Sequence, residues 1–336
     1  MKNIAIGGII LVVILLIVAF VLNSDMDNDV MDGNDNDTAT TTDTTGEEIN
    51  TNFEGASAVY YSDQADMVFV SSNTQSQVAM YDSALAQMTA MVGAADADGI
   101  YYNDDTQMLY QVNRTENQID VYEWDGMELT FVASSPSGEF INGRELAVMG
   151  DTLVVAQDAN DDNANQNALV VFEINGNAVD YVGTHNVDIN LWGIRSAGND
   201  LHAIVDNSNN VAVFAGFFDI DHSTSSALAA DTTISVEGLT RTHGLDYDAE
   251  NDLMILTDIG SADSDSDGAL VLVYDFMDAA ADGTVQLSEQ IRATGAETML
   301  GNPVDVALNY DAGLLYVAER ANGGGQLLTF ALPAQQ

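Results

Sequence analysis

The chain contains no cysteine. This absence excludes disulfide bonds, thiolate metal ligands, a cysteine nucleophile and a lipid anchor on an N-terminal cysteine. Proline is also scarce, with 3 residues among 336, so glycine, asparagine and aspartate must supply the turns. Hydrophobic residues make up 46% of the chain, enough for a substantial core, and wholesale disorder is therefore excluded.

Basic residues are scarce as well. Lysine and arginine together number 7 against 53 acidic residues, which gives a formal net charge of −46. Nucleic acid is excluded as a partner, because binding it requires clustered cations that neutralise phosphates. The acidity fits a salt-adapted surface, a calcium-rich extracellular setting, or solvation alone. Ca²⁺ is the one cofactor that this composition suggests.

Residues 4–22 read IAIGGIILVVILLIVAFVL, a run long enough to cross a bilayer as one helix. Lys2 precedes the run and several aspartates follow it, so the N-terminus is predicted in the cytoplasm and the rest outside. We expect an uncleaved single-pass anchor at 1–22 and a cell-surface or extracytoplasmic location. A cleaved signal peptide and a pilin-like polymerising helix are the alternatives.

Residues 23–48 are rich in aspartate, asparagine and threonine. Such a segment cannot bury enough apolar surface to offset the entropy of ordering, so we expect a disordered acidic tether. The folded domain is then predicted to span residues 49–336.

One pattern occurs six times from residue 49 onward: a strand, a polar turn, an apolar strand, a polar loop and a third strand that ends in an aromatic residue. Apolar runs this short, β-branched and bounded by turn residues indicate strands rather than helices. Two columns of residues align the copies. The second strands begin with Met67, Met108, Leu153, Leu201, Leu253 and Leu314, and the third strands end with Tyr81, Tyr122, Phe172, Phe214, Tyr274 and Phe330.

A fourth strand is predicted between successive copies, at 87–92, 128–133, 178–182, 233–236 and 285–291. The last copy has no room for its own, and residues 49–53 are the expected donor. Pairing the two ends in this way closes a ring of sheets. The predicted fold class is therefore all-β, a six-bladed β-propeller closed by its N-terminal strand.

The segment IVDNSNNVAVF at 204–214 is similar to the strand–turn–strand core of NHL repeats. With the sixfold pattern, it makes residues 50–332 resemble the six-bladed propellers of the NHL, TolB-like and gluconolactonase-like groups. The resemblance implies the fold more than the activity, because propellers include hydrolases, lyases, sensors and adhesion modules.

A polar residue stands five positions after the start of each second strand. Short polar side chains at strand ends accept hydrogen bonds from loop amides, so we expect mainly a structural role. The six residues are Ser72, Asn113, Asp158, Asp206, Asp258 and Glu319.

The fifth copy carries a D-x-D-x-D-G run that ends at Gly268, similar to the start of an EF-hand loop. Tyr274 stands where the bidentate glutamate belongs, so a complete EF-hand is excluded. A calcium loop completed by other oxygens and a solvated acidic loop both stay open. The candidate metal ligands are Asp258, Asp263, Asp265 and Asp267, and, more weakly, Asp158, Asp161 and Asp162 in the third copy.

Three arginines lie at or near the start of the first strand of their copies: Arg144, Arg195 and Arg241. First strands line the channel of a propeller, so these residues form a candidate ligand-binding funnel for a carboxylate or phosphate. The alternative is that each arginine pairs with a nearby acid, such as Glu145, and ties blades together.

The resemblance to gluconolactonase-like propellers also implies a divalent metal in the channel. Glu54 with Gly55 resembles the first metal-binding motif, and residues 241–258 resemble the motif that ends in a metal-binding aspartate, here Asp258. His243 stands where that group has asparagine, and Ala56 where it has proline. The implied catalytic set is therefore Glu54, Asp258 and His243, with two departures from the pattern.

Together these features favour a membrane-tethered, extracytoplasmic propeller that acts as a binding or surface-interaction module. Its partner is expected to be a protein or small molecule that contacts one propeller face. A metal-dependent hydrolase of the lactonase type and a subunit of an extracellular filament are the alternatives.

Overall fold

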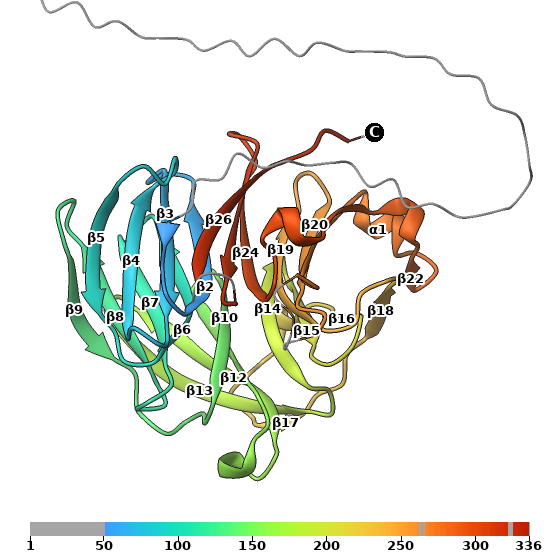
Figure 1. Ribbon diagram of the computed structural model, residues 1–336. Coiled ribbons are helices and arrows are strands. Elements are labelled where there is room, and N and C mark those ends of the chain that lie inside the picture. The colour runs from blue at the N-terminus through green and yellow to red at the C-terminus, as the bar shows by residue number, and fades with distance from the viewer. Residues whose placement is uncertain (1–50, 262–263, 265, 322–324, 336) are drawn as a thin grey trace, which may run out of the picture. The chain divides into compact units, whose positions relative to one another are not determined.

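The computed structural model describes residues 51–261, 264, 266–321 and 325–335 (Figure 1). The predicted span at 4–22 and the predicted tether at 23–48 lie outside these residues. So do Asp263 and Asp265 of the candidate calcium loop.

The predicted location needs correction. Across the described part of residues 51–335, no helix is long and apolar enough to cross a membrane. The span on which we based a single-pass anchor falls outside that part of the chain. The anchor, the membrane contact and the cell-surface location therefore lack structural support, and we do not retain them.

The described chain forms six sheets, each built mainly from antiparallel strands. Blade 1 contains β2 (Ala56–Ser62), β3 (Met67–Ser72), β4 (Gln77–Asp82) and β5 (Met88–Gly93). Blade 2 contains β6 (Ala97–Asn103), β7 (Met108–Asn113), β8 (Gln118–Trp124) and β9 (Leu129–Ser134). Blade 3 contains β10 (Gly143–Met149), β11 (Thr152–Gln157), β12 (Asn167–Asn175) and β13 (Ala178–Val187), with β17 (Ser226–Ala227) added in parallel.

Blade 4 contains β14 (Leu191–Ala197), β15 (Asp200–Val205), β16 (Asn210–Phe214) and β18 (Thr232–Val236), with β22 (Thr284–Val285) added in parallel. Blade 5 contains β19 (Thr242–Asp248), β20 (Leu253–Asp258), β21 (Ala269–Tyr274) and β23 (Ile291–Thr294). Blade 6 contains β24 (Pro303–Asn309), β25 (Leu314–Glu319), β26 (Gln326–Ala331) and β1 (Thr51–Asn52).

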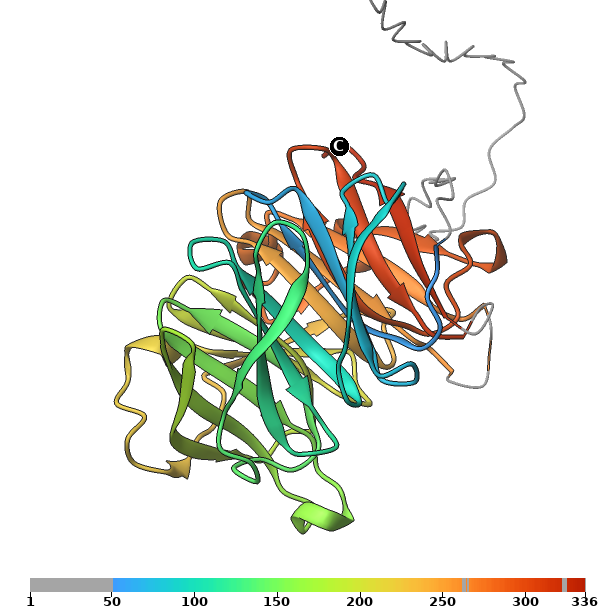
Figure 2. The ribbon, with the colours of Figure 1, turned by 90° about the vertical axis from the view of Figure 1, so that its left-hand side faces the viewer.

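The closure predicted from the sequence is confirmed. Strand β1 pairs antiparallel with β26, Thr51 opposite Leu327 and Asn52 opposite Gln326. Figure 2 shows the red C-terminal strands beside the blue N-terminal ones. Phe53, which follows β1, is buried and meets Tyr81 of blade 1 edge to face, with 6.5 Å between ring centroids. The first and last blades are therefore joined by both backbone pairing and side-chain packing.

One predicted fourth strand is wrong. The segment 285–291 was expected to complete blade 5, but it leads through β22 on blade 4 and the short helix η3 (Leu287–Glu289). A capping box between Gln286 and Glu289 favours that helical turn over an extended strand. Only Ile291 of the segment belongs to β23, the strand that completes blade 5.

The core is divided among the blade interfaces. Each of the six hydrophobic clusters joins two neighbouring blades, including blades 6 and 1. The inner strands contact one another in the closed order β2, β6, β10, β14, β19, β24 and back to β2. These six strands form the wall of a central channel, and the chain follows the blades in sequence order around it (Figure 1).

Candidate functional site: the central channel

The channel contains a pocket of about 190 Å³. Every inner strand contributes its fifth residue to the lining, because the six strands share one register around the axis. We call this set the channel ring, and it consists of Tyr60, Tyr101, Ala147, Arg195, Asp246 and Ala307. The order of the blades sets Tyr60 across from Arg195, Tyr101 across from Asp246, and the two small alanines across from each other.

An ion pair joins two neighbours of the channel ring. Arg195 Nε lies 3.0 Å from Asp246 Oδ1. Asp246 is held in place by the backbone, since its carboxylate accepts hydrogen bonds from the Tyr247 and Leu308 nitrogens, both at 2.9 Å. Burial alone would lower the pKa of Arg195. The nearby carboxyl groups of Asp246, Asp305 and Glu145 more than offset this effect, so its pKa is raised and the guanidinium stays charged. Nη1 and Nη2 of Arg195 donate no hydrogen bond to any described residue.

The two tyrosines of the channel ring contact each other edge to face, with 5.1 Å between the ring centroids of Tyr60 and Tyr101. Burial is the main reason that both have a raised pKa. Their hydroxyl groups therefore keep their protons at neutral pH and can donate hydrogen bonds.

Two carboxyl groups lie deeper in the wall, at the third positions of β10 and β24. Glu145 accepts a hydrogen bond from the Leu146 nitrogen at 3.0 Å, and Asp305 accepts one from the Val59 nitrogen at 2.8 Å. The third residue of β6 is Gly99, where a Cβ would lie 2.5 Å from Glu145 Oε1. Glycine at this position therefore makes room for the Glu145 carboxyl.

Burial raises the pKa of both Glu145 and Asp305, to about 7 for Asp305. The charge of Asp305 raises the pKa of Glu145 further, because two carboxylates in one low-dielectric space repel each other. We infer that this pair retains a proton at neutral pH, which limits the negative charge inside the channel.

The second positions of four consecutive inner strands form a connected layer. Arg144 Nη1 lies 3.8 Å from Asp98 on blade 2, and its guanidinium lies 4.1 Å over the ring of Trp192 on blade 4. Trp192 in turn stacks on His243 of blade 5, at 4.0 Å and 9° between the rings. We call Asp98, Arg144, Trp192 and His243 the stacked layer. The pairing register shifts between the first and fourth residues of each of these four strands, and a β-bulge there sets the direction of the second side chain.

The three predicted ligand-binding arginines lie on or next to inner strands, only Arg195 lines the channel pocket among the described residues, and each pairs with an acid. Arg144 donates to Asp158 Oδ2 from Nε at 3.0 Å and from Nη2 at 2.8 Å. Arg241, just before β19, pairs with Asp206 of blade 4 at 3.3 Å. The pairs at Arg195 and Arg241 join blades 4 and 5, whereas the pair of Arg144 and Asp158 lies within blade 3. The acid next to Arg144 in sequence, Glu145, is not its partner in any of these pairs. Whether the arginines bind an external anion stays a prediction.

The three residues of the implied lactonase set lie in different surroundings. Glu54 is exposed and accepts a hydrogen bond from Gln75 at 2.6 Å. Asp258 is buried and accepts from the backbone nitrogens of Thr240 at 2.9 Å and Arg241 at 2.6 Å. His243 belongs to the stacked layer. Within the described ranges, no group of three or more histidine, aspartate and glutamate side chains is placed to hold a metal.

The calcium candidates are dispersed in the part of the chain that the structure covers. Asp267 is exposed, Asp258 holds backbone nitrogens, and Asp158 pairs with Arg144. Asp161 and Asp162 begin the short helix η1 (Asp161–Asn163). Calcium binding stays a prediction, and two of its candidate ligands, Asp263 and Asp265, lie outside the described residues.

The structural role expected of the polar column is confirmed at five of its six residues. Asp158 differs, since its side chain accepts hydrogen bonds from Arg144 and Asn142 instead of from a loop amide. The other five accept hydrogen bonds from backbone nitrogens: Ser72, Asn113, Asp206, Asp258 and Glu319.

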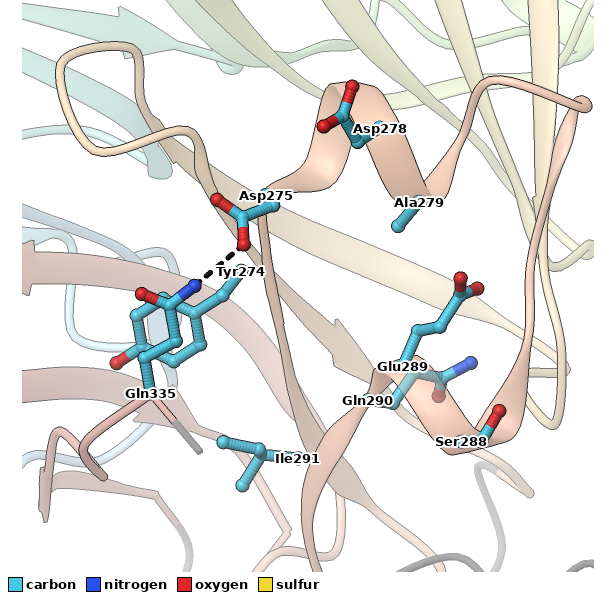
Figure 3. Close-up of a pocket in the computed structure, with 9 residues that line it drawn as sticks. All are labelled: Tyr274, Asp275, Asp278, Ala279, Ser288, Glu289, Gln290, Ile291 and Gln335. Carbon is cyan, nitrogen blue, oxygen red and sulfur yellow. Dashed lines mark hydrogen bonds between the residues drawn. The ribbon is translucent and has the colours of Figure 1, made fainter.

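A second pocket, of about 430 Å³, lies away from the channel beside the end of β21 (Figure 3). We call it the rim pocket; its walls include α1 (Phe276–Ala279) and η3. Gln335 donates a hydrogen bond of 2.6 Å to Asp275 there. Figure 3 shows the carboxylates of Asp275, Asp278 and Glu289 spread around the pocket, not converging on one point. This arrangement offers no focused binding site.

No protein-family model matches the chain, and no curated protein matches it. Solved structures do. A gluconolactonase of Xanthomonas campestris is 11% identical with a TM-score of 0.55, over 86% of this chain and 89% of that one. A luciferin-regenerating enzyme is 11% identical with a TM-score of 0.55, over 83% of this chain and 92% of that one. Hydrazine synthase of Kuenenia stuttgartiensis is 14% identical with a TM-score of 0.53, over 86% of this chain and 78% of that one.

The chain is a six-bladed propeller of this structural kind. The predicted resemblance to gluconolactonase-like propellers is thus confirmed for the fold. At such low identity the likeness carries no statement about activity.

Sequence reasoning missed most of the channel ring. It found Arg195, but not Tyr60, Tyr101 or Asp246. These residues could have been found from the sequence. The six first strands can be aligned on their apolar residues, and the residues at the fifth position of each strand can then be compared. That column holds two tyrosines, an arginine and an aspartate among positions that all face one axis.

Proposed function

We propose that the protein is a binding module that takes a small polar molecule into its central channel at the channel ring. The observation that carries this proposal is the pocket of about 190 Å³, lined by one residue from each inner strand. At about 30 Å³ per water molecule, that space corresponds to roughly six waters. It suits a compact ligand rather than a protein segment.

The channel ring offers the polar groups that orient a ligand. Arg195 and the hydroxyls of Tyr60 and Tyr101 are donors, and Asp246 is an acceptor. Ala147 and Ala307 leave the space open, whereas larger side chains at these two positions would fill it. Apolar walls with a few fixed polar groups are the usual makeup of small-molecule sites.

The metal-dependent hydrolase and the filament subunit stay alternatives. No contact described above favours either over the binding module, since the lactonase set does not converge within the described residues.

A plugged channel tests the proposal. Small polar molecules are screened by ligand-observed NMR against the intact protein, the Ala307→Leu variant and the control Ala331→Leu, which places the same side chain at an exposed position on β26. We expect the hits to lose affinity about tenfold or more with Ala307→Leu, a change of about 1.4 kcal/mol, and to be unaffected by the control.

Because Ala307 is buried, the folding of its variant is checked by circular dichroism. Tyr101→Phe, which removes only a hydroxyl, provides a milder second variant. Hits that bind all variants equally, or an absence of any hit from the screen, would overturn the proposal.

A further inference from the structure

A groove of about 350 Å³ continues the channel pocket at one end. The two cavities share Tyr61 and Asp246 in their linings, so a single ligand can occupy both. We call this cavity the mouth groove. Its remaining lining residues are Asp63, Tyr247, Asp248, Glu250, Asn251, Leu308, Tyr310 and Asp311.

Five of the ten residues that line the mouth groove are acidic. No lysine or arginine lines it among the described residues, and Asp63, Glu250 and Asp311 are exposed and accept no hydrogen bond from any of those residues. The hydroxyls of Tyr61 and Tyr247 are already donated, to Asp66 at 3.2 Å and to Asp252 at 2.8 Å. What these tyrosines offer a ligand is therefore the ring. Carboxylates beside aromatic rings attract an ammonium group, through charge and through the ring quadrupole.

The channel ring, in contrast, favours a carboxylate over an ammonium group. Nη1 and Nη2 of Arg195 donate to no residue in the part of the chain that the structure describes, and the hydroxyls of Tyr60 and Tyr101 retain their protons. A guanidinium with two free nitrogens binds a carboxylate well, because both N–H groups can point at its two oxygens. The one carboxylate in the ring, Asp246, is already paired with Arg195 and with two backbone nitrogens.

We propose that the channel ring and the mouth groove together bind a linear molecule with a carboxylate at one end and an ammonium at the other. This inference rests on the proposed function, because it uses the same channel site. The carboxylate lies against Arg195, with Tyr60 and Tyr101 as further donors. An alkyl chain passes Tyr61, and the ammonium lies among Asp63, Glu250 and Asp311.

The net charge of the chain also favours a ligand that carries an ammonium group in addition to its carboxylate. A formal net charge of −46 steers cationic groups toward the surface and repels free anions. A simple carboxylate would meet this field without compensation. A ligand that also carries an ammonium is drawn in by one end and held by the other.

Isothermal titration calorimetry with 6-aminohexanoate, hexanoate and hexylamine at 150 mM salt separates the contributions of the two ends. Because each end makes charge-assisted contacts, losing either end should weaken binding by about 10-fold or more. We expect 6-aminohexanoate to bind most tightly, with an affinity maximum as its methylene chain is varied. Equal binding of hexanoate or hexylamine would contradict the proposed ligand class.

Two variants locate the two ends, and a third serves as a control. Arg195→Gln should abolish the advantage of 6-aminohexanoate over hexylamine, and Glu250→Gln should reduce its advantage over hexanoate. The matched control is Asp278→Asn in the rim pocket, which removes the same unit of charge as Glu250→Gln. If the control weakens binding as much as Glu250→Gln, the attraction is general and the groove has no role.

Arg195 is a buried member of an ion pair, so its variant is accompanied by Tyr101→Phe in case the protein fails to fold. Tyr101→Phe should weaken hexanoate and 6-aminohexanoate but leave hexylamine unchanged. The proposed function is judged separately, with the Ala307→Leu plug. If other small molecules are lost on plugging while 6-aminohexanoate never binds, only the ligand class is wrong.

Discussion

The indole of Trp192 and the imidazole of His243 stack nearly parallel, with 4.0 Å between ring centroids and 9° between planes. The guanidinium of Arg144 also lies over the ring of Trp192, at 4.1 Å. Three consecutive inner strands are thereby joined side chain to side chain. Burial lowers the pKa of His243 below its ordinary value of 6.5, so the imidazole in this stack is neutral at pH 7.

The fluorescence of Trp192 should report this protonation. Trp124 is the only other tryptophan, so a Trp124→Phe variant leaves Trp192 as the single tryptophan, and excitation at the red edge of the absorption band avoids emission from tyrosine. We expect constant emission from pH 8 to about 6.5, and quenching at lower pH as His243 becomes charged. A Trp124→Phe, His243→Gln double variant should show no such step. A midpoint at or above 6.5 would contradict a buried, neutral histidine.

The pair of Arg144 and Asp158 should be important for stability. Both side chains are largely buried, at 16% and 15% exposure, and Nη2 lies 2.8 Å from Oδ2. Asp158→Ala leaves the guanidinium with Asp98 at 3.8 Å, and we expect a loss of about 3 kcal/mol in the free energy of unfolding. Asp162→Ala, an exposed aspartate in the same loop, should change it by no more than about 0.5 kcal/mol. Denaturant titration compares the two, and equal effects would refute the assignment.

Gly325 should be critical for the ring closure. Its φ is +127°, and a Cβ there would clash with the backbone nitrogen of Gly55, where the last blade meets the first. Gly126 also has a positive φ, +91°, but a Cβ there would meet no atom within 4 Å.

We expect Gly126→Ala to cost about 1 kcal/mol, the penalty of the left-handed backbone alone. Gly325→Ala should cost more, because a clash is added. Thermal unfolding of both variants measures the difference. Equal melting temperatures would mean that the close approach at the closure does not limit stability.

The pH dependence of stability should reveal the buried carboxyl group of Asp305. Burial raises its pKa from 3.8 to about 7, so the native state holds this proton more tightly than the unfolded state does. The resulting stabilisation is complete below pH 3.8 and is lost as the pH rises through about 7. Asp305→Asn removes the titration. Relative to that variant, the natural protein should therefore lose stability between pH 4.5 and 8, and a change in the opposite direction would exclude the raised pKa.

Much of the fold could be predicted from the sequence, because blade formation depends on local patterns. The apolar start of β3 at Met67 and the aromatic end of β4 at Tyr81 repeat in the later blades, and the pairing of β1 with β26 followed from counting strands. The strand prediction was wrong at 285–291, a segment that lies between blade 4 and blade 5 and contacts both. Those residues fit a strand, but the capping box at Gln286 and the free edge of β18 directed them elsewhere.

The channel could be predicted only in part. Arg144, Arg195 and Arg241 were placed correctly at the inner strands, because their rarity in an acidic chain made them conspicuous. Their partners were not, since Asp246 and Asp206 lie on the neighbouring blade of each pair and are distant in sequence. The tyrosines of the channel ring resembled ordinary core aromatics until the six strands were placed around one axis.

A crystal structure of the protein soaked with 6-aminohexanoate shows directly whether one ligand occupies both cavities. We expect difference density in the channel ring, with the carboxylate against Arg195 and the ammonium beside Glu250. Density confined to the rim pocket or the outer surface, with water alone between Tyr60 and Arg195, would contradict the proposed site.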